Sequence, residues 1–129
     1  MIANPFFLIA GLMAVFFSIG HALWGQRKIL GDVKTSAMPA ATKHMLIVIW
    51  NQPTVFHAAA AVALLTASTM QNDAGTDPLA VFIGVVTFGF FFNYVLTSLI
   101  RDRAALAQII PQMIGLAVYF VILAAGIRA

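Results

Sequence analysis

Four long apolar stretches, separated by short groups of charged residues, dominate the pattern of the chain. A helix needs about 20 apolar residues to cross the ~30 Å hydrocarbon core of a bilayer, and stretches of that length cover residues 5–25, 44–69, 78–100 and 104–127. In lipid, every backbone polar group must be bonded within the protein, which favours helices for such stretches. The pattern therefore predicts an all-α membrane protein, a transmembrane four-helix bundle that forms one domain over residues 1–129.

The residues at the ends of the apolar stretches support these boundaries. Asn4 and Asp77 are N-cap residue types, and each precedes a proline at the first helical position. The third and fourth spans are joined by residues 101–103, a link so short that the two helices must be antiparallel neighbours. We expect residues 26–43 to form the one sizeable loop, with Met38 onward as an interfacial extension of the second helix.

The charged residues lie only outside the apolar stretches, and they predict an orientation. Six of the seven Lys and Arg residues are in the first and third loops, whereas the second loop, residues 71–78, carries only acids. The positive-inside rule therefore predicts that both termini are outside. A mean hydropathy of +0.98 with 9% charged residues indicates a multi-pass membrane protein. We expect the bacterial inner membrane, with the net charge of +3 facing anionic lipid and no nucleic-acid partner.

Ionisable and amide side chains within the spans are the candidates for function, because such groups are costly in hydrocarbon. At coiled-coil spacing, His21 shares a seam with small residues of the first span and is expected to face protein, and His57 lies on a comparable seam of the second. The candidate ligand-binding residues are Trp24, Trp50, Asn51, Gln52, Asn93, Gln108 and Gln112. The amides could equally be interhelical polar links, and the histidines neutral hydrogen-bond donors.

Two imidazoles from different helices can ligate haem iron, so a b-type haem is the main cofactor alternative. His21 and His57 are the candidate haem or metal ligands. From the rise per residue, His21 lies about 9 Å and His57 about 21 Å inside the nearest loop charge. This mismatch of about 12 Å disfavours one haem held by both, unless a partner subunit supplies a ligand. Without a cysteine or a carboxylate in any span, zinc and di-iron centres are weakly supported.

The stretch around His21 resembles two families. His21, Gly25, Arg27 and Asp32 reproduce the H-x(3)-G-x-R-x(4)-D spacing of the cytochrome b membrane-anchor subunit of succinate dehydrogenase, although Lys28 replaces the second histidine of that pattern. The resemblance implies that His21 is a haem ligand, that Arg27 serves a propionate or a quinone headgroup, and that Asp32 orients the arginine. The stretch is also similar to small bacterial four-span integral membrane proteins of unassigned function with an H-x(3)-G-[EQ]-R-x-[IL]-L signature.

We predict a small accessory or interaction subunit with a polar cluster in the cytoplasmic half of the bundle, centred on His21, Asn51, Asn93 and Gln112. Little chain lies outside the spans, so its partners would be other membrane chains, further copies of itself, or a hydrophobic ligand such as a quinone. The alternative is a b-type haem- or quinone-binding electron-transfer subunit with His21 as axial ligand. A small transporter is less favoured, because the chain has no Glu and proton coupling would depend on His21 or His57. No residue pattern indicates a catalytic site.

Overall fold

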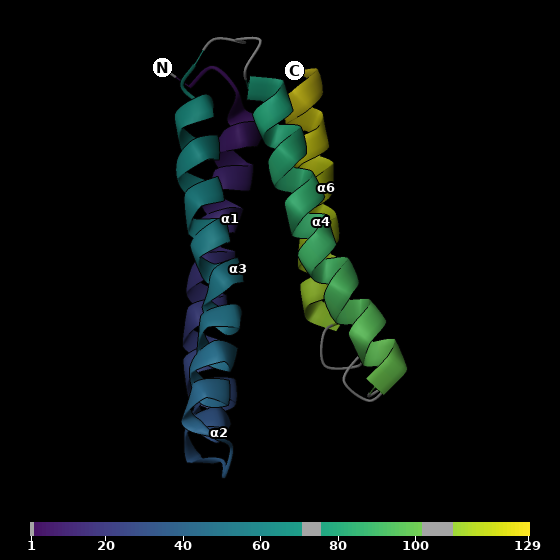
Figure 1. Cartoon of the computed structure of the whole chain (residues 1–129). Helices are drawn as coiled ribbons and strands as arrows, with labels where there is room; N and C mark the ends of the chain where they lie inside the picture. Colours follow the sequence, from purple (N-terminus) through teal and green to yellow (C-terminus); the bar gives the residue numbers. More distant parts are fainter. Residues whose placement is uncertain (1, 71–75, 102–109) are drawn as a thin grey trace. The chain divides into compact units, whose positions relative to one another are not determined.

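The computed structural model describes residues 2–70, 76–101 and 110–129. Over these residues the chain forms helices and no strand: α1 (Pro5–Trp24), the π-helical turn η1 (Gly25–Ile29), α2 (Leu30–Thr35), α3 (Ala40–Ala67), α4 (Thr76–Arg101) and α6 (Ile110–Arg128) (Figure 1). Among them, α1, α3, α4 and α6 are long and apolar enough to cross a membrane. The prediction of an all-α membrane protein with four spanning helices is confirmed.

The described residues form two compact units that share two of the helices. One unit holds residues 1–10 and 64–129, which comprise α4 and α6 with the first residues of α1 and the last residues of α3. The other unit holds residues 11–63, which comprise the rest of α1 and α3 together with η1 and α2.

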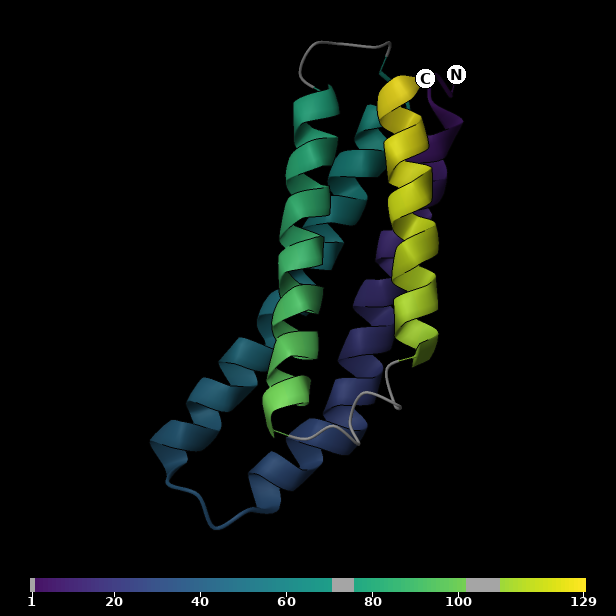
Figure 2. The same cartoon turned by 90° about the vertical axis from the view of Figure 1, so that its right-hand side faces the viewer.

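The predicted loop at 26–43 is wrong over most of its length, because the first helix continues past the apolar stretch. After α1 the backbone passes through η1, where the Leu30 N–H donates to the Gly25 carbonyl, and into α2. Only residues 36–39 separate α2 from α3, as Figure 2 shows. Lys and Arg are good helix formers, so a group of basic residues is compatible with a helix that leaves the membrane as well as with a loop. The expected helical extension after Met38 begins at Ala40.

Asn4 joins three helix ends in the first unit. Its Oδ1 accepts the N–H groups of Phe6 and Phe7 at 3.1 Å each, which confirms the predicted N-cap of α1. Its Nδ2 donates to the Gly126 carbonyl at 2.8 Å, near the end of α6. Its own N–H donates to the Ser68 carbonyl at 3.0 Å, just after α3. Asn4 is only 5% exposed, so these hydrogen bonds are shielded from solvent.

In the same unit, α4 packs against α6 in the antiparallel sense that the sequence predicted. The contacts pair Gly84 with Leu123, Thr87 with Tyr119, and Phe88 with Phe120. From Gly84 to Phe88 along α4, the contacted position on α6 moves back from Leu123 to Tyr119 and Phe120, as antiparallel neighbours require. The ring centroids of the phenylalanine pair are 6.2 Å apart. Tyr119 is the largest fully buried side chain among the described residues, and it interacts with the Thr87 hydroxyl, a polar contact inside an apolar interface that the sequence pattern did not reveal.

Candidate functional site

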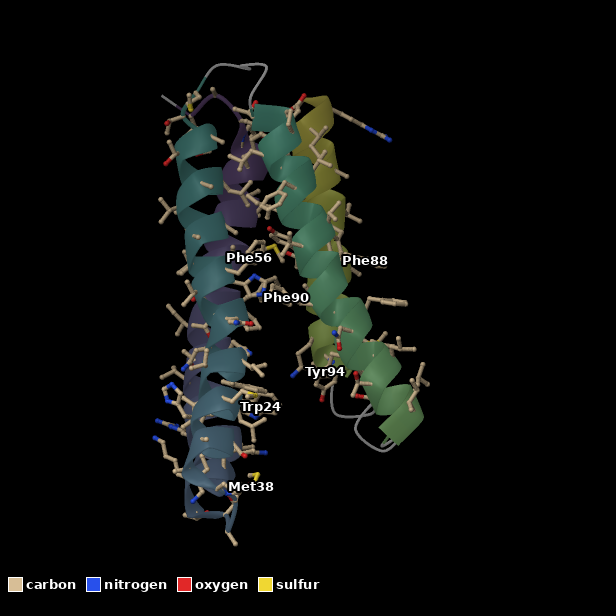
Figure 3. The ribbon with its side chains drawn as sticks, viewed as in Figure 1. Trp24, Met38, Phe56, Phe88, Phe90 and Tyr94 are labelled. Atoms are coloured by element: carbon tan, nitrogen blue, oxygen red, sulfur yellow. The ribbon has the colours of Figure 1, made fainter. Side chains whose placement is uncertain are left out.

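His21 and Trp50 face each other between α1 and α3 in the second unit. Their ring centroids are 4.4 Å apart, with the ring planes inclined by 42°. The Trp50 indole also covers Gly25, the first residue of η1, because a Cβ at position 25 would overlap the ring. Trp24, which Figure 3 labels, lies beside the same indole with a centroid separation of 6.3 Å. The indole therefore occupies the space that the missing side chain of Gly25 leaves open.

This contact follows from the antiparallel register of α1 and α3. The Ser18 hydroxyl donates to the Thr54 carbonyl at 3.0 Å, which sets residues 18 and 54 opposite each other. His21 is three residues after Ser18, and Trp50 is four residues before Thr54, so both lie about one turn farther toward the basic end of the pair. His21 is half-buried and faces α3, as its place on a seam of small residues predicted.

His57 lies on the other side of the Ser18–Thr54 contact. Its ring packs edge-on against Phe17, with centroids 6.0 Å apart, and against Phe56, with centroids 5.7 Å apart. His57 is seven residues beyond Trp50, which is about 10 Å along α3. It therefore lies three residues beyond Thr54 on α3, with Phe17 and Phe56 against its ring.

The two histidines do not fit the axial positions of one haem. Axial ligands approach the iron from opposite faces at nearly the same level, whereas the register separates His21 from His57 by about 10 Å along the helix pair. The sequence-based separation of about 12 Å was close to this value. Across the described ranges, no group of three or more His, Cys, Asp or Glu side chains is placed to hold a metal ion.

Four polar atoms on α1 and α3 are enclosed and, within the described part of the chain, have no hydrogen-bond partner: His21 Nδ1, Trp50 Nε1, Thr54 Oγ1 and His57 Nδ1. We name these four residues the polar seam. A buried polar atom without a partner costs about 1–3 kcal/mol, and native structures hold only a few per 100 residues. Four of these atoms lie on one helix pair, which makes this pair the candidate site.

The other predicted residues on this helix pair lie close to the polar seam without belonging to it. Asn51 is half-buried and Gln52 is exposed, immediately after Trp50 on α3. Arg27 is exposed on η1, two residues after Gly25. Arg27 and the polar seam thus belong to the same unit, with the arginine toward the basic end of the pair.

Two of the remaining predicted residues, Asn93 and Gln112, lie on α4 and α6 in the other unit. Asn93 is exposed and accepts a hydrogen bond from the Thr97 hydroxyl at 3.2 Å on its own helix. Gln112 is exposed on the first turn of α6, and Gln108 lies outside the described residues. The predicted cluster of His21, Asn51, Asn93 and Gln112 is therefore divided between the two units.

The packing role of Gly25 could not be predicted from the sequence. Gly25 entered the prediction only as a small residue on a seam and as one position of a motif, whereas the structure shows that it accommodates the Trp50 indole. A glycine one turn after an intramembrane histidine, just before a basic stretch, was the available signal. The tryptophan that uses this space could not be identified without the register of α1 and α3.

No protein-family model, curated protein or solved structure matches this chain. The function is therefore inferred from the residues and their arrangement.

Proposed function

We propose that this chain is a small accessory subunit of the bacterial inner membrane whose polar seam binds an uncharged, lipid-soluble ligand with hydrogen-bond-accepting oxygens. The observation that carries this proposal is the set of four enclosed polar atoms without partners on α1 and α3. Retaining them costs folding free energy. A ligand that accepts hydrogen bonds would compensate that cost when it binds.

The chemistry of the polar seam favours an acceptor ligand. The Trp50 indole can only donate, the Thr54 hydroxyl can donate, and each neutral imidazole donates from one of its nitrogens. No carboxylate lies on this part of the helix pair, so the seam offers donors without a fixed negative charge.

The spacing and the surroundings favour a planar ring. Trp50 and Thr54 lie one turn apart on the same face of α3, so one ligand that lies along the helix can reach both side chains. The rings of Trp24, His21 and Phe17 offer flat apolar surfaces next to these donors. Quinones combine both properties and dissolve in the bilayer, so they are the ligand class that we propose.

Quenching of tryptophan fluorescence tests this proposal, because Trp24 and Trp50 are the two tryptophans of the chain. In the Trp24→Phe variant, Trp50 is the only such fluorophore. We expect a short-chain quinone to quench Trp50 saturably in lipid nanodiscs. Thr54→Val should raise the half-saturating concentration about fivefold, because one hydrogen bond contributes about 1 kcal/mol.

The matched control is Val62→Ala on the same helix, where the side chain is 67% exposed and far along α3 from Trp50. This variant should bind as the parent does. Quenching that rises linearly with quinone concentration, and equally in the Thr54 and Val62 variants, would show collisions in the bilayer and overturn the proposal.

A further inference from the structure

The end of the helix pair that carries η1 and α2 is strongly basic. We name residues 25–47 the basic arm. It contains four Lys or Arg residues and a single acid, Asp32. The four are Arg27, Lys28, Lys34 and Lys43. This surplus of positive charge requires a counter-charge.

The basic arm extends beyond the hydrocarbon. The 20 residues of α1 rise about 30 Å and by themselves cover the apolar core. The five residues of η1 and six of α2 add about 16 Å of helix on one side. Headgroups occupy the outermost 5 Å or more of each leaflet, at a total thickness of about 40–45 Å. The basic arm therefore passes through the headgroup layer.

Three of the basic side chains of the basic arm are exposed, and a hydrogen bond fixes the turn between α2 and α3. Arg27, Lys28 and Lys34 are exposed. The Lys43 ammonium, from the first turn of α3, donates to the Lys34 carbonyl at 3.0 Å near the end of α2. This hydrogen bond ties the two sides of the turn together and keeps Lys34 and Lys43 close to each other.

Apolar side chains adjoin the charges on the same helix pair. Met45 is 61% exposed and Ile49 is 53% exposed on α3. Trp24 is 38% exposed at the last position of α1, and Figure 3 shows it toward the turned end of the pair, with Met38 beyond it. Tryptophan is enriched at the boundary between hydrocarbon and headgroups. The surface thus presents cations next to apolar area, which fits an anionic amphiphile better than a free anion or an acidic peptide.

We propose that the basic arm binds an anionic phospholipid. The headgroup phosphate would lie against its four Lys and Arg side chains, and the acyl chains would lie along α3. This site does not depend on the polar seam or on its ligand. It would give the protein a preference for anionic over zwitterionic lipid among the molecules next to the arm, beyond the general attraction of a basic surface to an anionic membrane.

Bromine-labelled lipids can measure this preference, because the tryptophans lie beside the basic arm. The full chain is reconstituted in bilayers where either phosphatidylglycerol or phosphatidylcholine carries dibrominated acyl chains, which quench tryptophan on contact. We expect phosphatidylglycerol to bind several times more strongly than phosphatidylcholine. Inorganic phosphate in the buffer should not compete, because it offers no acyl chains.

Neutral variants locate the site. The triple variant Arg27→Gln/Lys28→Gln/Lys34→Gln should lose the preference, whereas Arg27→Lys should keep it. The single variant Arg27→Gln should weaken the preference. Its matched control, Arg128→Gln, removes one charge beside the Asn4 end of α1 and should leave the preference unchanged. Equal binding of the two lipids by the unaltered protein would overturn the proposal without any variant. So would an undiminished preference in the triple variant, or competition by phosphate.

Discussion

The Trp50 indole lies where a Cβ of residue 25 would be, so Gly25 and Trp50 form a matched pair between η1 and α3. His21 packs on the same indole. The position of the imidazole is thus coupled to a backbone position one turn later in the chain. A change at residue 25 should therefore displace the Trp50 indole, whose Nε1 belongs to the polar seam, without substituting any residue of the seam.

We expect Gly25→Ala to displace Trp50 and to lower the free energy of unfolding by about 1–3 kcal/mol, the usual cost of overpacking an interface. The matched control is Gly20→Ala on α1, where a Cβ would meet nothing within 4 Å. That control should be neutral or stabilising by up to about 1 kcal/mol, since alanine is the better helix former. Unfolding in detergent, followed by tryptophan emission, measures both variants, and equal effects would contradict the pairing.

The hydrogen bonds of Asn4 should also contribute to the free energy of unfolding. Asn4→Ala removes the N-cap of α1 and the donor to the Gly126 carbonyl. We expect a loss of about 2–3 kcal/mol, from about 1 kcal/mol for the cap and about 1–2 kcal/mol for the carbonyl left without its partner. Asn4→Ser keeps a cap oxygen without adding a charge and loses the amide donor to Gly126, so it should cost less. A loss under 0.5 kcal/mol for Asn4→Ala would show that these bonds contribute little.

The spans and the N-cap of α1 could be predicted from the sequence, because apolar length and a local Asn-Pro pattern determine them. The helical course of residues 25–35 could not, since a basic stretch fits either a loop or a helix leaving the membrane. The pairing of Trp50 with Gly25 depends on the register between two helices, which periodicity leaves open. Asn93 and His21, which the sequence groups together, lie in different units, and their grouping stays a prediction.

The separation of the two histidines predicts that the purified protein will not carry one haem between them. We expect no Soret band in stoichiometric amount after expression with ample haem supply, because His21 and His57 differ by about 10 Å in level. A stoichiometric band that disappears in both His21→Ala and His57→Ala would contradict the register of α1 and α3. A band lost only in His21→Ala would indicate that another chain supplies the second ligand.

The orientation can be measured directly, because the chain has no cysteine and an introduced one is unique. Met70→Cys places a thiol just after α3, and Lys34→Cys places one on the basic arm. The positive-inside rule predicts that an impermeant maleimide labels position 70 on intact cells and position 34 only after permeabilisation. The reverse pattern would place the basic arm outside the cell and both termini inside.

If the enclosed donors of the polar seam bond to a ligand, the Trp50 indole N–H reports on this most directly. In protein carrying ¹⁵N-labelled tryptophan, the two indole N–H resonances are assigned with Trp24→Phe. We predict that a saturating short-chain quinone shifts the Trp50 proton resonance downfield, as a new hydrogen bond does, and that the shift is reduced in Thr54→Val. An unchanged Trp50 resonance at saturating quinone would show that the polar seam does not bond to this ligand.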